Sequence, residues 1–121
     1  MLWHPLTDIN QLHAIIQNSK EQSSQKLTVL LFKHSTRCSI SSMALNRFEN
    51  KWKDDESIKT YYLDLLNHRD VSNEIASILG VEHASPQVLL VRNGACFYHN
   101  SHTSINVNDI LEAIEIGRAH V

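Results

Sequence analysis

One cysteine stands in a setting that suits nucleophilic chemistry. Cys38 follows a run of strand-forming residues that ends at His34, and a helical pattern begins with it. A cysteine in the first turn of a helix has its thiolate stabilised by unpaired backbone N–H groups and by the helix dipole, which lowers the pKa of the thiol. The cations Arg37 and His34 are close to it in the chain. The position therefore predicts a nucleophilic thiol near neutral pH.

A serine occupies the place where a second thiol would be expected. Ser41 follows Cys38 by three residues, the spacing of a Cys-X-X-Cys redox motif. A hydroxyl cannot form a disulfide, so an outside thiol must release any group that Cys38 accepts. Ser41 can still donate a hydrogen bond to the Cys38 thiolate. The competing interpretation is that Cys38 is only a small buried residue, as many free cysteines are.

Hydrophobic periodicity predicts the elements that position this motif. Helices are expected at 8–17, 38–52 and 70–79 and after Asn106, and strands at 27–34, 58–65, 87–91 and 95–101. In the second helix the inward residues would be Ile40, Ala44, Phe48 and Trp52. The order, with an Asn93-Gly94 hairpin late in the chain, predicts a thioredoxin-like α/β fold. Its mixed sheet would have four strands, a parallel part and a C-terminal antiparallel hairpin, flanked by four helices.

A second motif, Ser85-Pro86-Gln87, leads into the third predicted strand. In a fold of this kind a cis proline at this point faces the cysteine helix, and the residue before it offers backbone groups to a substrate chain. We therefore expect a cis bond before Pro86 and a substrate contact at Ser85. The alternative is an ordinary proline that opens a strand.

Length, composition and charge favour a single globular domain and count against a nucleic-acid-binding or membrane-spanning protein. The 121 residues suit a single domain, expected over 1–115, and the net charge of -2 argues against nucleic-acid binding. No apolar run is long enough to cross a membrane, and no secretory signal is recognised, so we expect a cytoplasmic protein. We also expect a monomer. Two cysteines are too few for a disulfide framework. Residues 116–121 break the last helical pattern and are predicted to be a non-native tail.

The second cysteine, Cys96, and the histidines near the end of the last strand, His99 and His102, are further candidate site residues. Cys96 lies in the hairpin, about 15–20 Å from Cys38 at the rise of a strand, and a disulfide needs Cα atoms within about 7 Å. It is therefore interpreted as a strand residue. The returning strand should bring His102 toward Pro86 and the substrate. His99 and His102 lack the partners and spacing of a zinc site, so no metal is expected.

The sequence resembles the monothiol bacilliredoxins of the bacillithiol system over residues 6–115. The resemblance rests on Phe32-Lys33-His34-Ser35, Cys38-Ser39-Ile40-Ser41, Ser85-Pro86-Gln87-Val88 and Ser101-His102. The family pattern is close to Thr-Cys-Pro-Ile-Ser. Here Arg37 replaces the threonine and Ser39 replaces the proline, and residues inside such motifs influence the pKa of the thiol.

The resemblance implies a thioredoxin fold and the removal of bacillithiol from S-bacillithiolated proteins. Cys38 would attack the mixed disulfide, accept the bacillithiol moiety and free the client thiol, and bacillithiol or a reductase would then regenerate it. Bacillithiol would be a substrate, with no tightly bound cofactor. The residues assigned to catalysis are Cys38 and Ser41, and those assigned to substrate binding are Arg37, Ser39, Ser85, Pro86 and His102.

Two other functions remain open from the sequence. The first is a thioredoxin-like binding module that has lost catalysis and holds a partner peptide on the Pro86 face. The second is a monothiol-glutaredoxin-like protein that uses glutathione and binds an iron–sulfur cluster. The sequence has no Cys-Gly-Phe-Ser string, which counts against the second.

Overall fold

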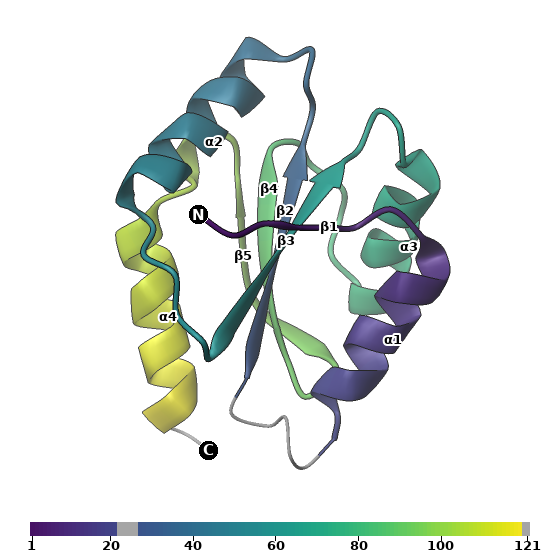
Figure 1. Ribbon diagram of the computed structural model, residues 1–121, viewed down its shortest axis with the longest axis vertical. Helices are drawn as coiled ribbons and strands as arrows, with labels where there is room; N and C mark the ends of the chain where they lie inside the picture. Colours follow the sequence, from purple (N-terminus) through teal and green to yellow (C-terminus); the bar gives the residue numbers. More distant parts are fainter. Residues whose placement is uncertain (22–26, 120–121) are drawn as a thin grey trace.

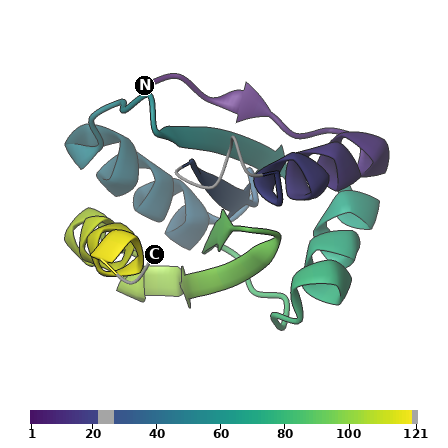
Figure 2. The same cartoon turned by 90° about the horizontal axis from the view of Figure 1, so that it is seen from below.

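A five-stranded mixed sheet lies between two pairs of helices in the computed structural model, which describes residues 1–21 and 27–119 (Figure 1). Helices α1 and α3 cover one face of the sheet, and α2 and α4 cover the other (Figure 2). The strand order is β1-β3-β2-β4-β5. The elements in chain order are β1 (His4–Pro5), α1 (Ile9–Ser19), β2 (Thr28–His34), α2 (Ser39–Lys51), β3 (Ile58–Asp64), α3 (Arg69–Leu79), β4 (Gln87–Arg92), β5 (Ala95–Ser101), the 3-10 turn η2 (His102–Ser104) and α4 (Val107–Ala119).

The sheet has one strand more than the sequence predicts. Strand β1 pairs in parallel with β3, with His4 opposite Tyr61 and Pro5 opposite Tyr62. Two residues give no alternating pattern, and proline is a poor strand signal although an edge strand tolerates it. The other predicted pairings are confirmed: β2 and β3 are parallel, and β4 and β5 form an antiparallel hairpin.

Strand β2 is the centre of the molecule, and every one of its residues is buried. Leu31 packs with the core between the sheet and helices α1 and α3, whereas Leu30 and Phe32 pack with the core on the side of α2 and α4. Because both faces are covered, the two polar residues at the C-terminal end of the strand, Lys33 and His34, are buried as well.

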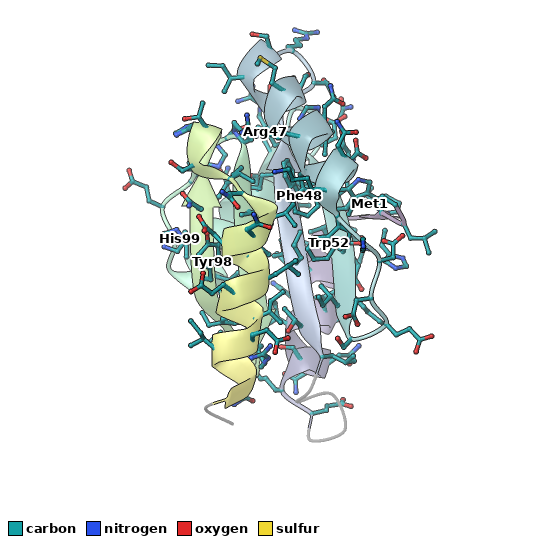
Figure 3. The ribbon with its side chains drawn as sticks, turned by 90° about the vertical axis from the view of Figure 1, so that its left-hand side faces the viewer. Met1, Arg47, Phe48, Trp52, Tyr98 and His99 are labelled. Carbon is teal, nitrogen blue, oxygen red and sulfur yellow. The ribbon has the colours of Figure 1, made fainter. Side chains whose placement is uncertain are left out.

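Helix α2 turns a slightly different face to the sheet than the sequence predicts. Ala44, Phe48 and Trp52 are buried as expected, and the Phe48 and Trp52 rings stack with centroids 5.0 Å apart (Figure 3). Ile40 is instead 49% exposed, and Ser41 takes the inward position. Buried positions at 41, 44, 48 and 52 follow the three- and four-residue spacing of a helix, which a strict four-residue repeat misses.

Turns and helix ends mostly follow their local signals. Gly80 ends α3 with φ of 67°, and Asn93 and Gly94 form the hairpin with φ of 53° and 75°. Asn106 accepts a hydrogen bond from the Asp109 N–H at the start of α4. No helix among residues 1–21 and 27–119 is long and apolar enough to span a bilayer.

The last helix runs further than the sequence pattern. It continues through Ala119, so residues 116–119 extend α4, and residues 120 and 121 lie outside the described part of the chain. That residues 116–121 are a non-native tail stays a prediction.

Candidate active site

Cys38 lies at the junction that the sequence predicts. It is the N-cap residue of the 13-residue helix α2, with extended φ and ψ of −106° and 121°, and its side chain makes no capping hydrogen bond. Its carbonyl oxygen accepts from the Ser42 N–H, and its own N–H donates to the Ser35 carbonyl at 3.2 Å. The residue is partly exposed. A sulfur held here is open to a reaction partner and faces the positive end of a helix dipole.

Ser41 joins the end of β2 to the first turn of α2. Its buried hydroxyl oxygen accepts from the Ser35 N–H at 3.0 Å and lies 2.7 Å from Nδ1 of His34. Burial lowers the pKa of His34, although the Asp64 and Glu49 carboxylates act in the opposite direction. The imidazole is therefore neutral near pH 7, and a neutral ring can either accept from this hydroxyl or donate to it. A hydrogen bond from Ser41 to the Cys38 thiolate stays a prediction.

The proline motif lies at the same end of the sheet. The Ser85–Pro86 bond is cis, the isomer expected from the sequence, and the Pro86 carbonyl accepts from the His102 N–H at 3.0 Å. Gln87, the first residue of β4, pairs with Lys33 on one side and Ser101 on the other. The pairing of β4 with β2 and β5 thus brings Ser85, Pro86 and His102 to the C-terminal end of β2, the strand that leads to Cys38.

Among these residues Ser85 has a free polar atom. Its hydroxyl oxygen is buried and has no hydrogen-bond partner within residues 1–21 and 27–119. His102 is exposed and holds φ of 57°, where the chain leaves β5 for η2. Arg37 and Ser39, which flank Cys38, are also exposed. The residues assigned to substrate binding therefore come from three separate segments that share one end of the fold.

A buried lysine that the sequence analysis did not single out lies behind this edge. The Lys33 ammonium donates to the Ser72 carbonyl at 3.1 Å and lies 3.3 Å from Nδ1 of His83. Burial lowers its pKa to about 8. Its neighbour across the strands, Gln87, keeps a buried side-chain oxygen without a hydrogen bond in the described chain. The available signal was a lone charge in the otherwise apolar run Val29-Leu30-Leu31-Phe32-Lys33.

Cys96 belongs to the opposite end of the sheet. It lies in β5 opposite Val91, and its thiol donates to the Tyr98 carbonyl at 3.3 Å. Burial raises the pKa of Cys96, and hydrogen bonds with the backbone of Tyr98 and Leu90 oppose the shift only in part. Pro86 precedes Val91 by five residues, which is about 16 Å along a strand. Cys96 is thus a strand residue, as predicted, and both cysteines are free.

The two thiols should differ in their rate of alkylation. With iodoacetamide near neutral pH we expect Cys38 to be modified at least about tenfold faster than Cys96, since the thiolate is the reactive species and burial disfavours it at Cys96. Peptide mass spectrometry over a time course gives both rates, and unfolded protein in urea, where the two rates should converge, is the control. Faster labelling of Cys96 would contradict the assignment of Cys38, at the N-terminus of α2, as the more reactive thiol.

Metal ligands do not gather at this site. Over the described part of the chain, no three His, Cys, Asp or Glu side chains are grouped so that they could hold a metal ion. His99 pairs with Leu89 within the hairpin.

Comparisons with known proteins concern the family and the fold of the chain. The family model described as monothiol bacilliredoxin BrxC matches residues 4–110. A solved structure of a proposed oxidoreductase with a thioredoxin fold is 33% identical, covers 90% of each chain and has a TM-score of 0.74. Fasciola hepatica thioredoxin is 14% identical over 94% of this chain and 98% of its own, with a TM-score of 0.70. Spinach chloroplast thioredoxin f is 12% identical over 94% and 91%, with a TM-score of 0.67. The chain therefore has a thioredoxin fold.

Proposed function

Because the chain belongs to the monothiol bacilliredoxin family and has the fold of thiol oxidoreductases, we propose that it removes bacillithiol from S-bacillithiolated proteins. The observation that carries the proposal is the place of Cys38. It is a partly exposed thiol at a helix N-terminus, at the end of the sheet that also holds the cis proline.

The proposed reaction is a single thiol–disulfide exchange. The Cys38 thiolate attacks the bacillithiol sulfur of the mixed disulfide and forms a new S–S bond. The bond between bacillithiol and the client breaks, its electron pair stays on the client sulfur, and that sulfur takes a proton from water. Cys38 is left carrying bacillithiol, with no net change in the number of disulfide bonds.

Neighbouring groups support the binding of such a substrate. Backbone groups of Ser85, next to the cis proline, can pair with the client chain, and the unpartnered Ser85 hydroxyl can add a hydrogen bond. Ile40 and Met43 expose apolar side chains, 49% and 64% accessible, on the first turns of α2. An apolar rim of this kind suits a protein client more than a small polar molecule alone.

A second thiol from outside the molecule must complete the cycle. Cys96 lies at the far hairpin, and position 41 holds a hydroxyl that bonds to His34 and Ser35. We therefore propose that free bacillithiol, or another reductase thiol, attacks the adduct. That step forms bacillithiol disulfide, or a mixed disulfide with the reductase, and returns the Cys38 thiolate. Such a cycle suits a monomer in the reducing cytoplasm.

Intact mass spectrometry can follow both steps. We expect the reduced protein to gain one bacillithiol from a client modified at a single cysteine, with the adduct on Cys38, and to lose it when free bacillithiol is added. Dithiothreitol, which strips the same client chemically, is the positive control. A client that binds the protein but keeps its adduct would overturn the proposal in favour of a peptide-binding module.

A further inference from the structure

A polar pocket opens next to Arg37, the residue that precedes Cys38. It is formed where the loop between β2 and α2 meets the loop between β3 and α3, and its volume is about 300 Å³. The Leu65 N–H donates to the His34 carbonyl at 3.1 Å and ties the two loops together. These loops follow neighbouring parallel strands, at the edge of a sheet where ligands commonly bind. The lining residues are Thr36, Arg37, Leu66, Asn67 and Arg69.

The pocket carries positive charge that nothing nearby neutralises by contact. Within residues 1–21 and 27–119, neither Arg37 nor Arg69 belongs to an ion pair. Neither guanidinium donates a hydrogen bond to a described residue.

Asp64 and Asp70, the acidic residues close to Arg69 in the chain, do not line the pocket. One oxygen of Asp64 accepts from the Asn67 amide at 2.8 Å, and the other is buried without a hydrogen-bond partner among residues 1–21 and 27–119. Exposed guanidinium groups without a partner are able to receive an anion from solution. Arginine is the side chain best suited to hold a carboxylate, because its planar fork of N–H donors matches two carboxylate oxygens.

We propose that this pocket binds the carboxylate-bearing end of the small thiol that Cys38 takes from its substrate. The inference rests on the proposed function and adds a recognition site for the adduct that is transferred to Cys38. Arg37 directly precedes Cys38, and consecutive Cα atoms are about 3.8 Å apart, so the lining of the pocket begins one residue from the thiol. A volume of about 300 Å³ suits part of a small molecule and not a folded client.

A larger pocket provides the matched control. It measures about 610 Å³ and lies between α2, η2 and the start of α4, where Arg47 and Lys51 contribute cations. None of the residues that line it belongs to the loops around Cys38. Figure 3 shows Arg47 on α2, on this side of the molecule. Arg47→Gln therefore removes one positive charge from the protein without changing the pocket beside the thiol.

The test keeps one client protein and varies only the adduct. The client cysteine is joined either to mercaptosuccinate, which has two carboxylates, or to 2-mercaptoethanol, which has none. The rate of transfer to Cys38 is measured by acid quench and intact mass. We expect the ratio of the two rates to fall about 10- to 100-fold in the double variant R37Q/R69Q, the range for losing one or two hydrogen bonds to charged groups. In R47Q the ratio should stay within about twofold, and salt should reduce the wild-type ratio.

Each other result overturns the inference in a distinguishable way. Equal ratios in wild type and R37Q/R69Q, with both adducts transferred, would reject the pocket and leave the proposed function standing. A second client of opposite net charge, carrying the same adduct, extends the test: a rate difference between the two clients that R37Q/R69Q removes would assign the arginines to the client instead. Failure of both adducts, and of bacillithiol carried by the same client, to reach Cys38 would reject the proposed function and this site with it. The inert thioether S-methyl mercaptosuccinate adds a binding readout: it should shift the Asn67 and Arg69 amide resonances in wild type and not in the double variant.

Discussion

Replacing Cys38 with serine is expected to reduce transfer of bacillithiol from a modified client to the rate seen without protein. The thiolate is the species that attacks a disulfide, and a serine hydroxyl is not ionised near neutral pH. The substitution is nearly isosteric, and the Cys38 side chain makes no capping hydrogen bond that the fold would lose. The measurement is the appearance of free client thiol, followed by intact mass over time.

Cys96→Ser is the matched control for this variant. Cys96 is half-buried in the hairpin and far along the sheet from the cis proline, so its loss should leave the transfer rate within about twofold. Together the two variants show how much each thiol contributes to the transfer rate. Transfer by Cys38→Ser at the wild-type rate, or loss of transfer only in Cys96→Ser, would show that the nucleophile has been assigned wrongly.

Replacing Lys33 with methionine is expected to stabilise the protein near pH 7 by about 1–3 kcal/mol. Burial lowers the pKa of Lys33 from 10.5 to about 8, so folding must hold a charged ammonium in an apolar core. That difference in pKa corresponds to about 3 kcal/mol against the charged form, part of which methionine loses again with the hydrogen bonds to Ser72 and His83.

The pH dependence of this effect has a fixed sign. The folded pKa of Lys33 lies below the unfolded one, so the unfolded chain binds more protons between about pH 8 and pH 10.5. The wild type therefore recovers stability as the pH rises through this window, and loses it again as the pH falls toward 8. The gain from Lys33→Met should be constant below pH 8 and should shrink above it.

Urea unfolding near neutral pH and near pH 10 measures both quantities. The exposed Lys59 on β3 offers the control, since Lys59→Met should change the free energy of unfolding by no more than about 0.5 kcal/mol at either pH. A destabilised Lys33→Met protein would mean that the contacts of the ammonium with Ser72 and His83 outweigh the cost of burying it.

What the sequence predicted correctly is governed by local chemistry. The Asn93-Gly94 turn, the left-handed Gly80 and the cap at Asn106 each depend on a few neighbouring residues, and so does the place of Cys38 between β2 and α2. Long apolar runs such as Val29-Leu30-Leu31-Phe32 identify a central strand without any knowledge of its partners.

What the sequence missed depends on contacts between distant segments. Strand β1 exists only because β3 offers it an edge, and two residues with a proline carry no pattern of their own. Ile40 was expected inside and Ser41 was not, because the inward position at the start of α2 is decided by His34 at the end of β2. The candidate site shows the same limit. Arg69, the first residue of α3, joins Arg37 in one pocket from about thirty residues later in the chain, a separation that no local motif spans.

The hydrogen bonds of Ser41 affect how a reductase could distinguish the free Cys38 thiol from the form that carries an adduct. In a dithiol relative, oxidation adds a covalent crosslink inside the loop, and the shape of the loop can report it. Here the loop is held by hydrogen bonds of Ser35, Ser41 and His34, none of which has a sulfur atom that could form a disulfide. The backbone of this loop should then have the same conformation whether Cys38 is a free thiol or carries bacillithiol. A recycling reductase would therefore have to recognise the bound bacillithiol itself.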